Sequence, residues 1–394
     1  MGALDGLVVL DLTHVVAGPF CTMLLGDMGA DVVKVERPGH GDHSRAWQPQ
    51  WNGTACTFLA LNRNKRSIAV DLEKPGARAV IQALASRADV VVESLRTPSL
   101  AKLGITYDEL RAANPQLVYC SISGYGRTGP KAHLGGYDLI AQAYGALMSV
   151  TGEPGGPPVR AGYSVIDIFT GMAAYGAIVT ALLQREKTGV GQYVETSLLD
   201  SVVAQMSYHA VAYLATGKVP GPLGTQSPSL VPYQLFDAAD AQLIVGCNND
   251  IAWQRLCTAI ERPDLARDAR FATNSDRLRN KADLIPLLCD VFRTRTAAAW
   301  GSVLEANGVP CSPIHSVADV LADEQVAARE LVPDVPHPEI PGLRAPGPPF
   351  RVVGAERRAS TPPPALGGHS DAILRELGFT AQDIAALRAD GVVA

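Results

Sequence analysis

Short runs of valine, leucine and isoleucine alternate with helical segments along the first third of the chain, and this alternation is the strongest constraint on the fold. We expect strands over residues 7–12, 31–36, 89–93 and 117–122, and helices from Pro19 to Gly29, over 77–87 and over 107–113. Strands separated by helices pair in parallel, and helices then cover both faces of the sheet. The sequence therefore predicts an α/β fold with a Rossmann-like parallel sheet.

The opening strand is followed by a loop at 14–18 and a helix, as in a dinucleotide-binding domain, but no G-x-G-x-x-G sequence follows the strand. Glycines at those spacings let the backbone approach a pyrophosphate. The chain therefore gives no support for a nicotinamide cofactor.

The amino-acid composition of the chain changes beyond Tyr208. Gly217–Pro232 is rich in glycine, proline and serine, as in a linker or an active-site loop. The tail after Pro333 is proline-rich and is expected to run extended over the surface. Further strands are expected at 233–236 and 243–245, and further helices at 136–150, 168–186, 251–260, 282–292 and 370–377. The region from 233 to 330 therefore reads as a smaller α+β unit.

Charge and cysteine content argue against several classes of function. The formal net charge is −5 and no lysine or arginine cluster occurs, so a nucleic-acid partner is not expected. The seven cysteines are scattered without a C-x-x-C pair, which removes the usual zinc and redox motifs and suits a reducing compartment. The N-terminus lacks the basic start of a signal peptide. We expect a cytoplasmic protein with no bound metal.

No apolar run reaches the length of a membrane span. The longest candidate, Ile166–Leu183, is interrupted by Asp167, Thr170, Gly171 and Gly176. A membrane span is therefore not expected.

Asp167 is an acidic side chain in an otherwise apolar and small-residue setting, and two interpretations of it stay open. Aspartate is a favoured N-cap, and an apolar helix begins within a few residues. Alternatively, a carboxylate beside Val165, Ile166 and Ile168 is costly to bury unless it is paired or used. Poor solvation would then make it a better nucleophile than a surface carboxylate.

The segment around Asp167 resembles the class III CoA-transferases, the family that includes formyl-CoA transferase, carnitine CoA-transferase and alpha-methylacyl-CoA racemase. In that family D-x-x-x-G-M, a small-residue helix and R-E-(K/R)-T-G-x-G-Q mark the catalytic aspartate. Asp167, Gly171, Met172 and residues 185–192 match this pattern in order and spacing. The resemblance extends over nearly the whole chain and implies that Asp167 is a nucleophile.

The resemblance also implies an architecture. A large CoA-binding domain would comprise residues 1–210 and be completed by the C-terminal segment 335–394. A linker or active-site loop would span 211–232, and a small domain would span 233–334. Two subunits would interlock as a homodimer, with each active site near the subunit interface.

The loop His14-Val15-Val16-Ala17 precedes a helix whose N-terminus offers free N–H groups to an anion or a thiolate. By itself this is an ordinary strand–helix turn, and a lone histidine in a loop is usually solvated or hydrogen-bonded. The resemblance implies that the loop lies beside the CoA thioester. His14, Val15 and Val16 would then contact CoA, and Ala17 would support the reaction through its backbone.

Arg37 ends a strand in a sequence similar to the family's K-(V/I)-E-x-P-G motif. It is either a surface charge near Glu36 or, as the motif implies, a partner for the CoA phosphates, which its planar fork suits. The basic segment 62–67 carries three cations and also suits an anionic ligand.

The chain departs from the family after the strand that ends in Glu93. Where the family reads N-F-R-P-G, this sequence has Ser94-Leu95-Arg96-Thr97-Pro98, so Arg96 keeps the charge and Leu95 replaces an aromatic residue. The resemblance implies CoA contacts for a set of residues in this region and at one earlier position: Val70, Ser94, Leu95, Arg96, Lys102 and Leu103.

Tyr137 and Asp138 bear on the type of reaction. The racemase branch has a histidine where this chain has Tyr137, and two-base racemisation needs proton carriers with pKa values reachable near neutrality. A tyrosine, with an unperturbed pKa of about 10, is a poor substitute. Asp138 would hold or repel Asp167 and so tune its charge. A core aromatic with a hydrogen-bonded hydroxyl also accounts for Tyr137.

We therefore expect a transferase that moves CoA from an acyl-CoA donor to a free carboxylic acid. Coenzyme A thioesters would be its substrates, and no permanently bound cofactor is expected. The region 221–232 lacks the G-G-G-G flap of formyl-CoA transferase, which argues against assuming its substrate pair. The alternatives are an acyl-CoA racemase and a CoA-binding protein without turnover.

Overall fold

The computed structural model describes residues 2–354 and 359–394, which form two compact units. Unit 1 comprises residues up to 147, 160–216 and 327 to the C-terminus, and unit 2 comprises 148–159 and 217–326. Compared with the division expected from the sequence, the first block ends at 216 instead of 210, the return begins at 327 instead of 335, and 148–159 joins the smaller unit.

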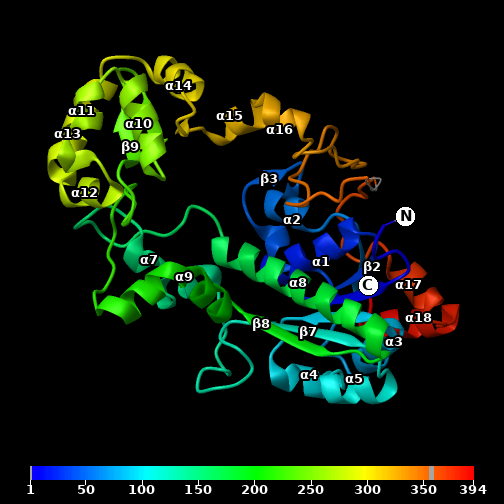
Figure 1. Ribbon diagram of the computed structural model, residues 1–394. Helices are drawn as coiled ribbons and strands as arrows, with labels where there is room; N and C mark the ends of the chain where they lie inside the picture. Colours follow the sequence, from blue (N-terminus) through cyan, green and yellow to red (C-terminus); the bar gives the residue numbers. More distant parts are fainter. Residues whose placement is uncertain (1, 355–358) are drawn as a thin grey trace. The chain divides into compact units, whose positions relative to one another are not determined.

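Unit 1 is built on a six-stranded parallel sheet, which confirms the expected α/β class (Figure 1). In sheet order the strands are β5 (Lys65–Ala69), β2 (Asp31–Glu36), β1 (Val8–Leu12), β6 (Val90–Glu93), β7 (Val118–Ser123) and β8 (Tyr193–Ser197). The chain moves outward from β1 to β2 and β5, and then returns to the other side of β1 with β6. Such a reversal opens a crevice at the carboxyl ends of the two central strands, where ligands of α/β sheets bind.

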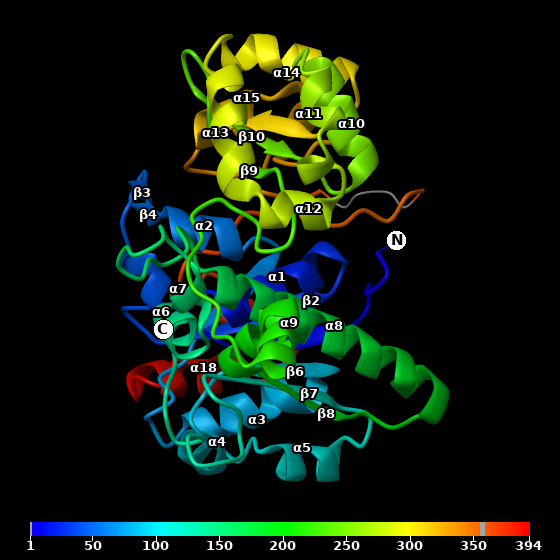
Figure 2. The same cartoon turned by 60° about the vertical axis from the view of Figure 1, so that its left-hand side comes forward.

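Helices cover both faces of the sheet, which is why its strands are apolar on both sides (Figures 1 and 2). On one face α1 (Ala17–Asp27) and α8 (Val165–Thr188) pack on Val9, Val32 and Val90. The opposite face carries α3 (Ala77–Arg87), α4 (Thr97–Leu103), α5 (Tyr107–Ala113), α17 (Ser370–Glu376) and α18 (Ala381–Ala389). Both chain ends therefore contribute to unit 1.

The remaining elements of unit 1 lie around this sheet. They are the 3₁₀ turn η1 (His43–Ala46), the hairpin β3 (Gln50–Trp51) and β4 (Thr54–Ala55), and the helices α2 (Cys56–Leu61), α6 (Asp138–Tyr144) and α9 (Leu198–Thr216). Of the described helices, α8 alone is long and apolar enough to cross a membrane by length and composition, a test that core helices of soluble proteins also meet.

Two expectations about unit 1 are wrong. The helix expected over 136–150 is interrupted at Gly145 and Ala146, and α7 (Leu147–Val150) follows separately. A side chain at Gly145 would collide with Val202 of α9, so the chain leaves α6 where the two helices meet. The tail after Pro333 does not run only over the surface, because Val335 and Ile340 are buried in a cluster with Leu59.

Unit 2 holds a three-stranded antiparallel sheet in the order β11-β10-β9, with helices packed on it. The strands are β9 (Tyr233–Asp237), β10 (Gln242–Gly246) and β11 (Cys311–Pro313), and the helices are α10 (Asp250–Ala259), α11 (Pro263–Arg267), α12 (Asn274–Arg279), α13 (Lys281–Phe292), α14 (Ala297–Ala306) and α15 (Val317–Ala322); α16 (Glu324–Ala328) follows. The core contains the buried rings of Trp253, Trp300 and Phe271. The α+β character expected for this region is therefore present.

Close packing of α8 on α1 generates a stability prediction. A Cβ at Gly171 would lie 2.5 Å from the carbonyl oxygen of Ala17, so Gly171→Ala forces the two helices apart. We expect a loss of about 1–3 kcal/mol in the free energy of unfolding, measured by urea denaturation. Gly176→Ala on the same helix meets no atom of the described residues within 4 Å and should gain about 0.5–1 kcal/mol. Equal effects of the two substitutions would contradict this account of the contact.

Candidate active site

The residues expected to contact CoA follow the carboxyl ends of neighbouring strands. Val70 follows β5, Arg37 follows β2, residues 14–17 follow β1, and Ser94 follows β6. Because all strands of the sheet are parallel, these positions lie along one edge of the sheet, on both sides of the reversal between β1 and β6. The structure thus brings four separate segments of the sequence to the same edge.

The side chains at this edge differ in what they can offer a ligand. Ser94, Arg96 and Lys102 are exposed, and Leu95 is half-buried. Arg37 is 59% exposed and lies 3.6 Å from Glu73. Because both side chains are exposed, this ion pair does not fully neutralise the charge of Arg37.

Val70 and Leu103, in contrast, are buried in the core beneath the sheet. The backbone N–H of Val70 donates to the carbonyl oxygen of Glu36. Neither of the two side chains is therefore presented to solvent at the edge.

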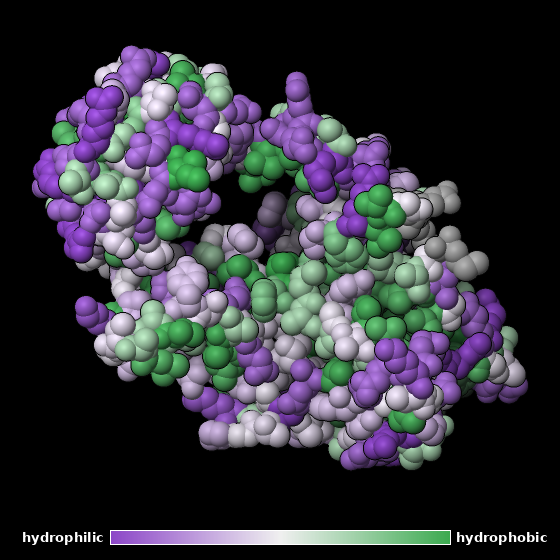
Figure 3. Space-filling model, in the orientation of Figure 1, coloured by the Kyte–Doolittle hydropathy of each residue, from purple (hydrophilic) through white to green (hydrophobic). Residues whose placement is uncertain are grey.

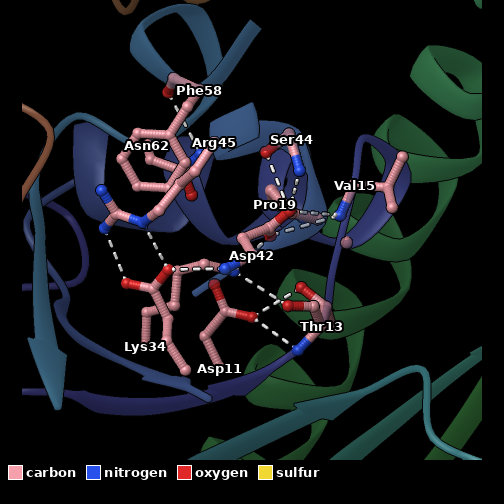
Figure 4. A network of polar contacts seen from close by, with 12 residues as sticks. Asp11, Thr13, Val15, Pro19, Lys34, Asp42, Ser44, Arg45, Phe58 and Asn62 are labelled. Atoms are coloured by element: carbon pink, nitrogen blue, oxygen red, sulfur yellow. Dashed lines mark hydrogen bonds and ion pairs between the residues drawn. The ribbon is translucent and has the colours of Figure 1, made fainter. Parts of the chain in front are cut away.

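A buried charge network holds the loop after β1 (Figure 4). Asp11 on β1 accepts hydrogen bonds from the Thr13 backbone N–H (2.9 Å) and hydroxyl (2.5 Å), and it pairs with Lys65 of β5 at 3.1 Å. Lys34 of β2 donates to the Thr13 carbonyl oxygen at 2.8 Å and pairs with Asp42 at 2.9 Å. Two cations and two carboxylates therefore balance in the interior and fix Thr13 from both sides.

The electrostatics of this network follow from burial and pairing. Burial by itself would raise the pKa of Asp11, but Lys34 and Lys65 hold it well below its ordinary value. Burial by itself would raise the pKa of Asp42, but the charge of Lys34 together with the hydrogen bonds from Ser44 and Lys34 lowers it to about 2. Burial lowers the pKa of Lys65 to about 8 in spite of the nearby Asp11. The network is therefore fully charged near neutral pH, and it begins to lose a cation in mild alkali.

Asp42 also holds the loop in a strained form. Val15 has a φ of 73°, in the left-handed region that β-branched residues avoid, and its backbone N–H lies 3.2 Å from both Asp42 carboxylate oxygens. Such a conformation costs on the order of 1–3 kcal/mol and persists only where its surroundings enforce it. In the sequence, the sign of this buried charge network is the presence of Asp11 and Lys34 inside apolar strands.

The cations of the basic segment 62–67 are each paired with a carboxylate. Lys65 is occupied by Asp11, Arg63 pairs with Asp27 at 2.6 Å, and Arg66 pairs with Asp31 at 2.6 Å. The segment enters β5, an edge strand not expected from the sequence, and its cations bind other parts of unit 1.

A second buried carboxylate supports the loop after β6. Glu93 pairs with Arg127 at 2.8 Å and accepts a hydrogen bond from the Leu95 backbone N–H at 2.8 Å. Sequence reasoning assigns no role to Glu93 or Arg127. For Glu93 the signal is the same as for Asp11, a charged residue inside an apolar strand, whereas Arg127 lies in the loop after β7 and has no such signal.

Asp167 lies in the first turn of α8, but it is not the helix cap. The helix begins at Val165, and its first N–H groups are taken by the Asp138 carboxylate, which accepts from Ile166 at 2.8 Å and from Asp167 at 3.2 Å. Within the described part of the chain, the Asp167 carboxylate itself accepts no hydrogen bond. The cap interpretation is therefore wrong for Asp167, and Asp138 performs that role.

Burial and, to a smaller extent, the nearby charge of Asp138 together raise the pKa of Asp167 to about 7. A carboxylate in the first turn of a helix is usually stabilised by free N–H groups and by the helix dipole. Here Asp138 takes the N–H groups. Asp167 is consequently a poorly solvated carboxylate that ionises close to neutral pH, as a nucleophile should.

The supporting residues meet around this helix. Ala17 begins α1, and its carbonyl oxygen faces Gly171, one turn after Asp167. Tyr137 precedes α6 and is 69% exposed, so its interpretation as a core aromatic is wrong.

His14 stands apart from the other predicted residues. Among the described residues its buried Nδ1 has no hydrogen-bond partner, and its ring meets the ring of His43 edge-on, with centroids 6.1 Å apart. Burial and the neighbouring Lys34 lower the pKa of His14, which keeps the imidazole neutral near pH 7.

Comparison with known proteins identifies the family. The model of CoA-transferase family III matches residues 4–370. The chain belongs to CoA-transferase family III. This membership places it among the enzymes that transfer CoA from an acyl-CoA to a carboxylate.

Two relatives and one solved structure illustrate the family likeness. The chain is 41% identical to a succinyl-CoA:glutarate CoA-transferase of Homo sapiens, over 99% of this chain and 90% of that protein. It is 38% identical to an acetyl-CoA:oxalate CoA-transferase of Acetobacter aceti, over 90% of each. A CAIB/BAIF family protein from Brucella suis has the same fold, with a TM-score of 0.84 and 40% identity over 95% of this chain and 99% of that one.

The raised pKa of Asp167 predicts how stability varies with pH. The unfolded carboxyl ionises near its ordinary pKa of 3.8 and the folded one at about 7, so the folded protein loses stability as pH rises through this window. Asp167→Asn should therefore match the wild type near pH 4 and exceed it near pH 8 by on the order of 1–3 kcal/mol. Urea unfolding at both pH values measures this difference.

Glu186→Gln is the matched control, because Glu186 is an exposed carboxylate on the same helix. It should change stability by the same small amount at both pH values. A gain for Asp167→Asn that did not grow with pH would show that Asp167 is solvated like a surface residue.

Proposed function

We propose that this CoA-transferase works through covalent catalysis by Asp167. The observation that carries the proposal is the state of this carboxylate, which is half-buried with its pKa raised by burial, accepts no hydrogen bond within the described residues, and lies one helical turn before Gly171, which meets the Ala17 carbonyl oxygen. A carboxylate with those properties is a competent nucleophile toward a thioester carbonyl. The family pattern around Asp167 supports the same role.

The first half of the reaction forms two enzyme intermediates. An Asp167 carboxylate oxygen attacks the thioester carbonyl carbon, the C–S bond breaks, and CoA leaves as a thiolate, which gives a mixed anhydride. The thiolate then attacks the aspartyl carbonyl carbon and expels the donor acid as a carboxylate. The enzyme now carries an aspartyl-CoA thioester, and no proton or water has been used.

The second half repeats these steps with the acceptor. Its carboxylate attacks the aspartyl thioester carbonyl, the thiolate leaves, and a second anhydride forms. The thiolate attacks the acceptor acyl carbon and returns Asp167 as a carboxylate. Each intermediate keeps the activation of the thioester, so water must be excluded from the site.

The sheet edge supplies the binding functions in this proposal. Arg37, Arg96 and Lys102 would hold the CoA phosphates, and the loop from His14 to Val16 would hold the thioester end. Backbone N–H groups at the start of α1, at Ala17 and Gly18, have no partner within the helix and would stabilise the oxyanions. Val70, Ser94, Leu95 and Leu103 complete the proposed CoA contacts, the buried pair through backbone atoms.

We propose a short dicarboxylic acid as the acceptor. The human relative is named for succinyl-CoA and glutarate, and the Acetobacter relative for oxalate. The acceptor of this chain would be of the same class.

A homodimer is also proposed, as in the family. Large apolar side chains are exposed on α8 and α9, among them Leu183, Val211 and Leu214, and apolar surface gathers over these helices in Figure 3. Such a surface is typical of an interface. Light scattering on the purified protein tests the dimer.

Removal of the nucleophile provides the direct test of the mechanism. Asp167→Asn should lower the transfer rate by roughly four orders of magnitude or more while CoA binding is retained. The wild type, incubated with acyl-CoA donors and quenched with hydroxylamine, should carry an adduct at Asp167 in peptide mass mapping. Glu186→Gln should keep both activity and adduct. Solvent deuterium entering the alpha carbon of a branched acyl-CoA, with no adduct, would restore the racemase alternative.

The charge of Asp138 should be visible in the pH dependence of the same reaction. Only ionised Asp167 attacks, so kcat/KM for the donor should fall about tenfold per pH unit below about 7. Asp138→Asn removes the like charge and should move this inflection to lower pH. An inflection that stays in place would show that burial alone sets the pKa of Asp167.

A further inference from the structure

Negative charge accumulates where the substrates would react. Asp138 and Asp167 both lie at the N-terminus of α8, and neither forms an ion pair with any described residue. A dicarboxylate acceptor brings two more negative charges to this place. Unless a cation compensates the carboxylate that does not react, its repulsion by the two aspartates would disfavour binding.

Several arginines of unit 1 are already paired. Arg45, Arg63, Arg66, Arg127 and Arg185 each form an ion pair with a carboxylate. Their charges hold the fold together and cannot serve an incoming acid without loss of those contacts.

Arg160 differs from them. It is exposed, and within the described part of the chain its guanidinium donates only to the carbonyl oxygens of Ala161 at 3.0 Å and Gly162 at 3.5 Å. It forms no ion pair with any residue that the structure describes. Its positive charge is therefore uncompensated, seven residues before Asp167 in the sequence.

The segment that carries Arg160 is fixed relative to Asp167. The Ala161 backbone N–H donates to Gln142 Oε1 at 2.9 Å, and the Gln142 amide donates to Asp138. Asp138 in turn accepts from the Asp167 backbone N–H. Because Gln142 is fully buried, this relay is protected from water and joins the base of Arg160 to the backbone of Asp167.

We propose that Arg160 binds the distal carboxylate of a dicarboxylic substrate whose other carboxyl group reacts at Asp167. The inference rests on the proposed function and adds a specificity residue to it. A guanidinium forms two parallel hydrogen bonds with a carboxylate, which gives direction as well as charge. A monocarboxylate of the same length has no group for Arg160, so the residue selects between the two classes of acid.

Competition between two acceptors tests this role. Glutarate and pentanoate have equal chain length and differ in the distal carboxylate, and their kcat/KM ratio does not depend on the donor. Arg160→Gln should lower kcat/KM for glutarate by roughly 10- to 100-fold and leave pentanoate unchanged. Arg111→Gln should alter neither, since Arg111 is an exposed arginine on α5 that lies over the ring of Tyr107.

Charge reversal gives a second, positive readout. Arg160→Glu should prefer 5-aminopentanoate, in which a protonated aminomethyl group replaces the distal carboxylate, over glutarate. An unchanged glutarate-to-pentanoate ratio in Arg160→Gln would overturn the inference, as would a wild type without preference for glutarate. Hydroxylamine quenching separates failure of the Arg160 inference from failure of the proposed mechanism. An adduct at Asp167 in the wild type supports the mechanism even if Arg160 has no effect.

Discussion

The buried pairing of Asp11 and Lys34 with Lys65 and Asp42 is the interaction on which the rest of unit 1 depends. It ties the three neighbouring strands β1, β2 and β5 together, and it fixes the loop through the Thr13 backbone. Loss of one partner would leave an uncompensated buried charge, which typically costs about 3–5 kcal/mol. Apolar residues could fill the same volume, but they could not hold Thr13 and Val15 by directed hydrogen bonds. The buried charges therefore contribute more to the geometry of the loop after β1 than to the stability of the fold.

A second pair of carboxylates, Asp138 and Asp167, is not balanced by a cation from any described residue. Asp138 takes the N–H groups that would stabilise Asp167, and its charge disfavours ionisation of its neighbour. Formation of an anhydride or thioester removes the negative charge from Asp167. In the proposed mechanism, burial and repulsion are therefore relieved by acylation, and the energy stored in the free carboxylate favours the covalent intermediates.

Much of unit 1 could be predicted from the sequence, because buried parallel strands such as β1 and β6 are apolar on both faces and stand out as continuous runs. β5 cannot be recognised as an apolar run, because Lys65, Arg66 and Ser67 are polar and bind partners elsewhere in unit 1. Asp167 could be located from its apolar surroundings and from the family pattern. That Asp138 caps α8 could not be predicted, because the two residues are far apart in the sequence and only the tertiary fold brings them together. Gln142 and Arg160 carry no local signal for the same reason.

The close approach of α1 and α8 explains why small residues surround the nucleophile. Gly171 lets the Ala17 carbonyl approach the helix, and any side chain there would push the loop after β1 away from Asp167. Reactions of this type need the attacking oxygen and the oxyanion donors to be placed within a few tenths of an ångström, because misplacement costs rate steeply. The buried charges hold the loop from below and Gly171 sets its distance from α8. Both constraints act on the same few backbone atoms, so the geometry proposed for catalysis is a consequence of how the core is packed.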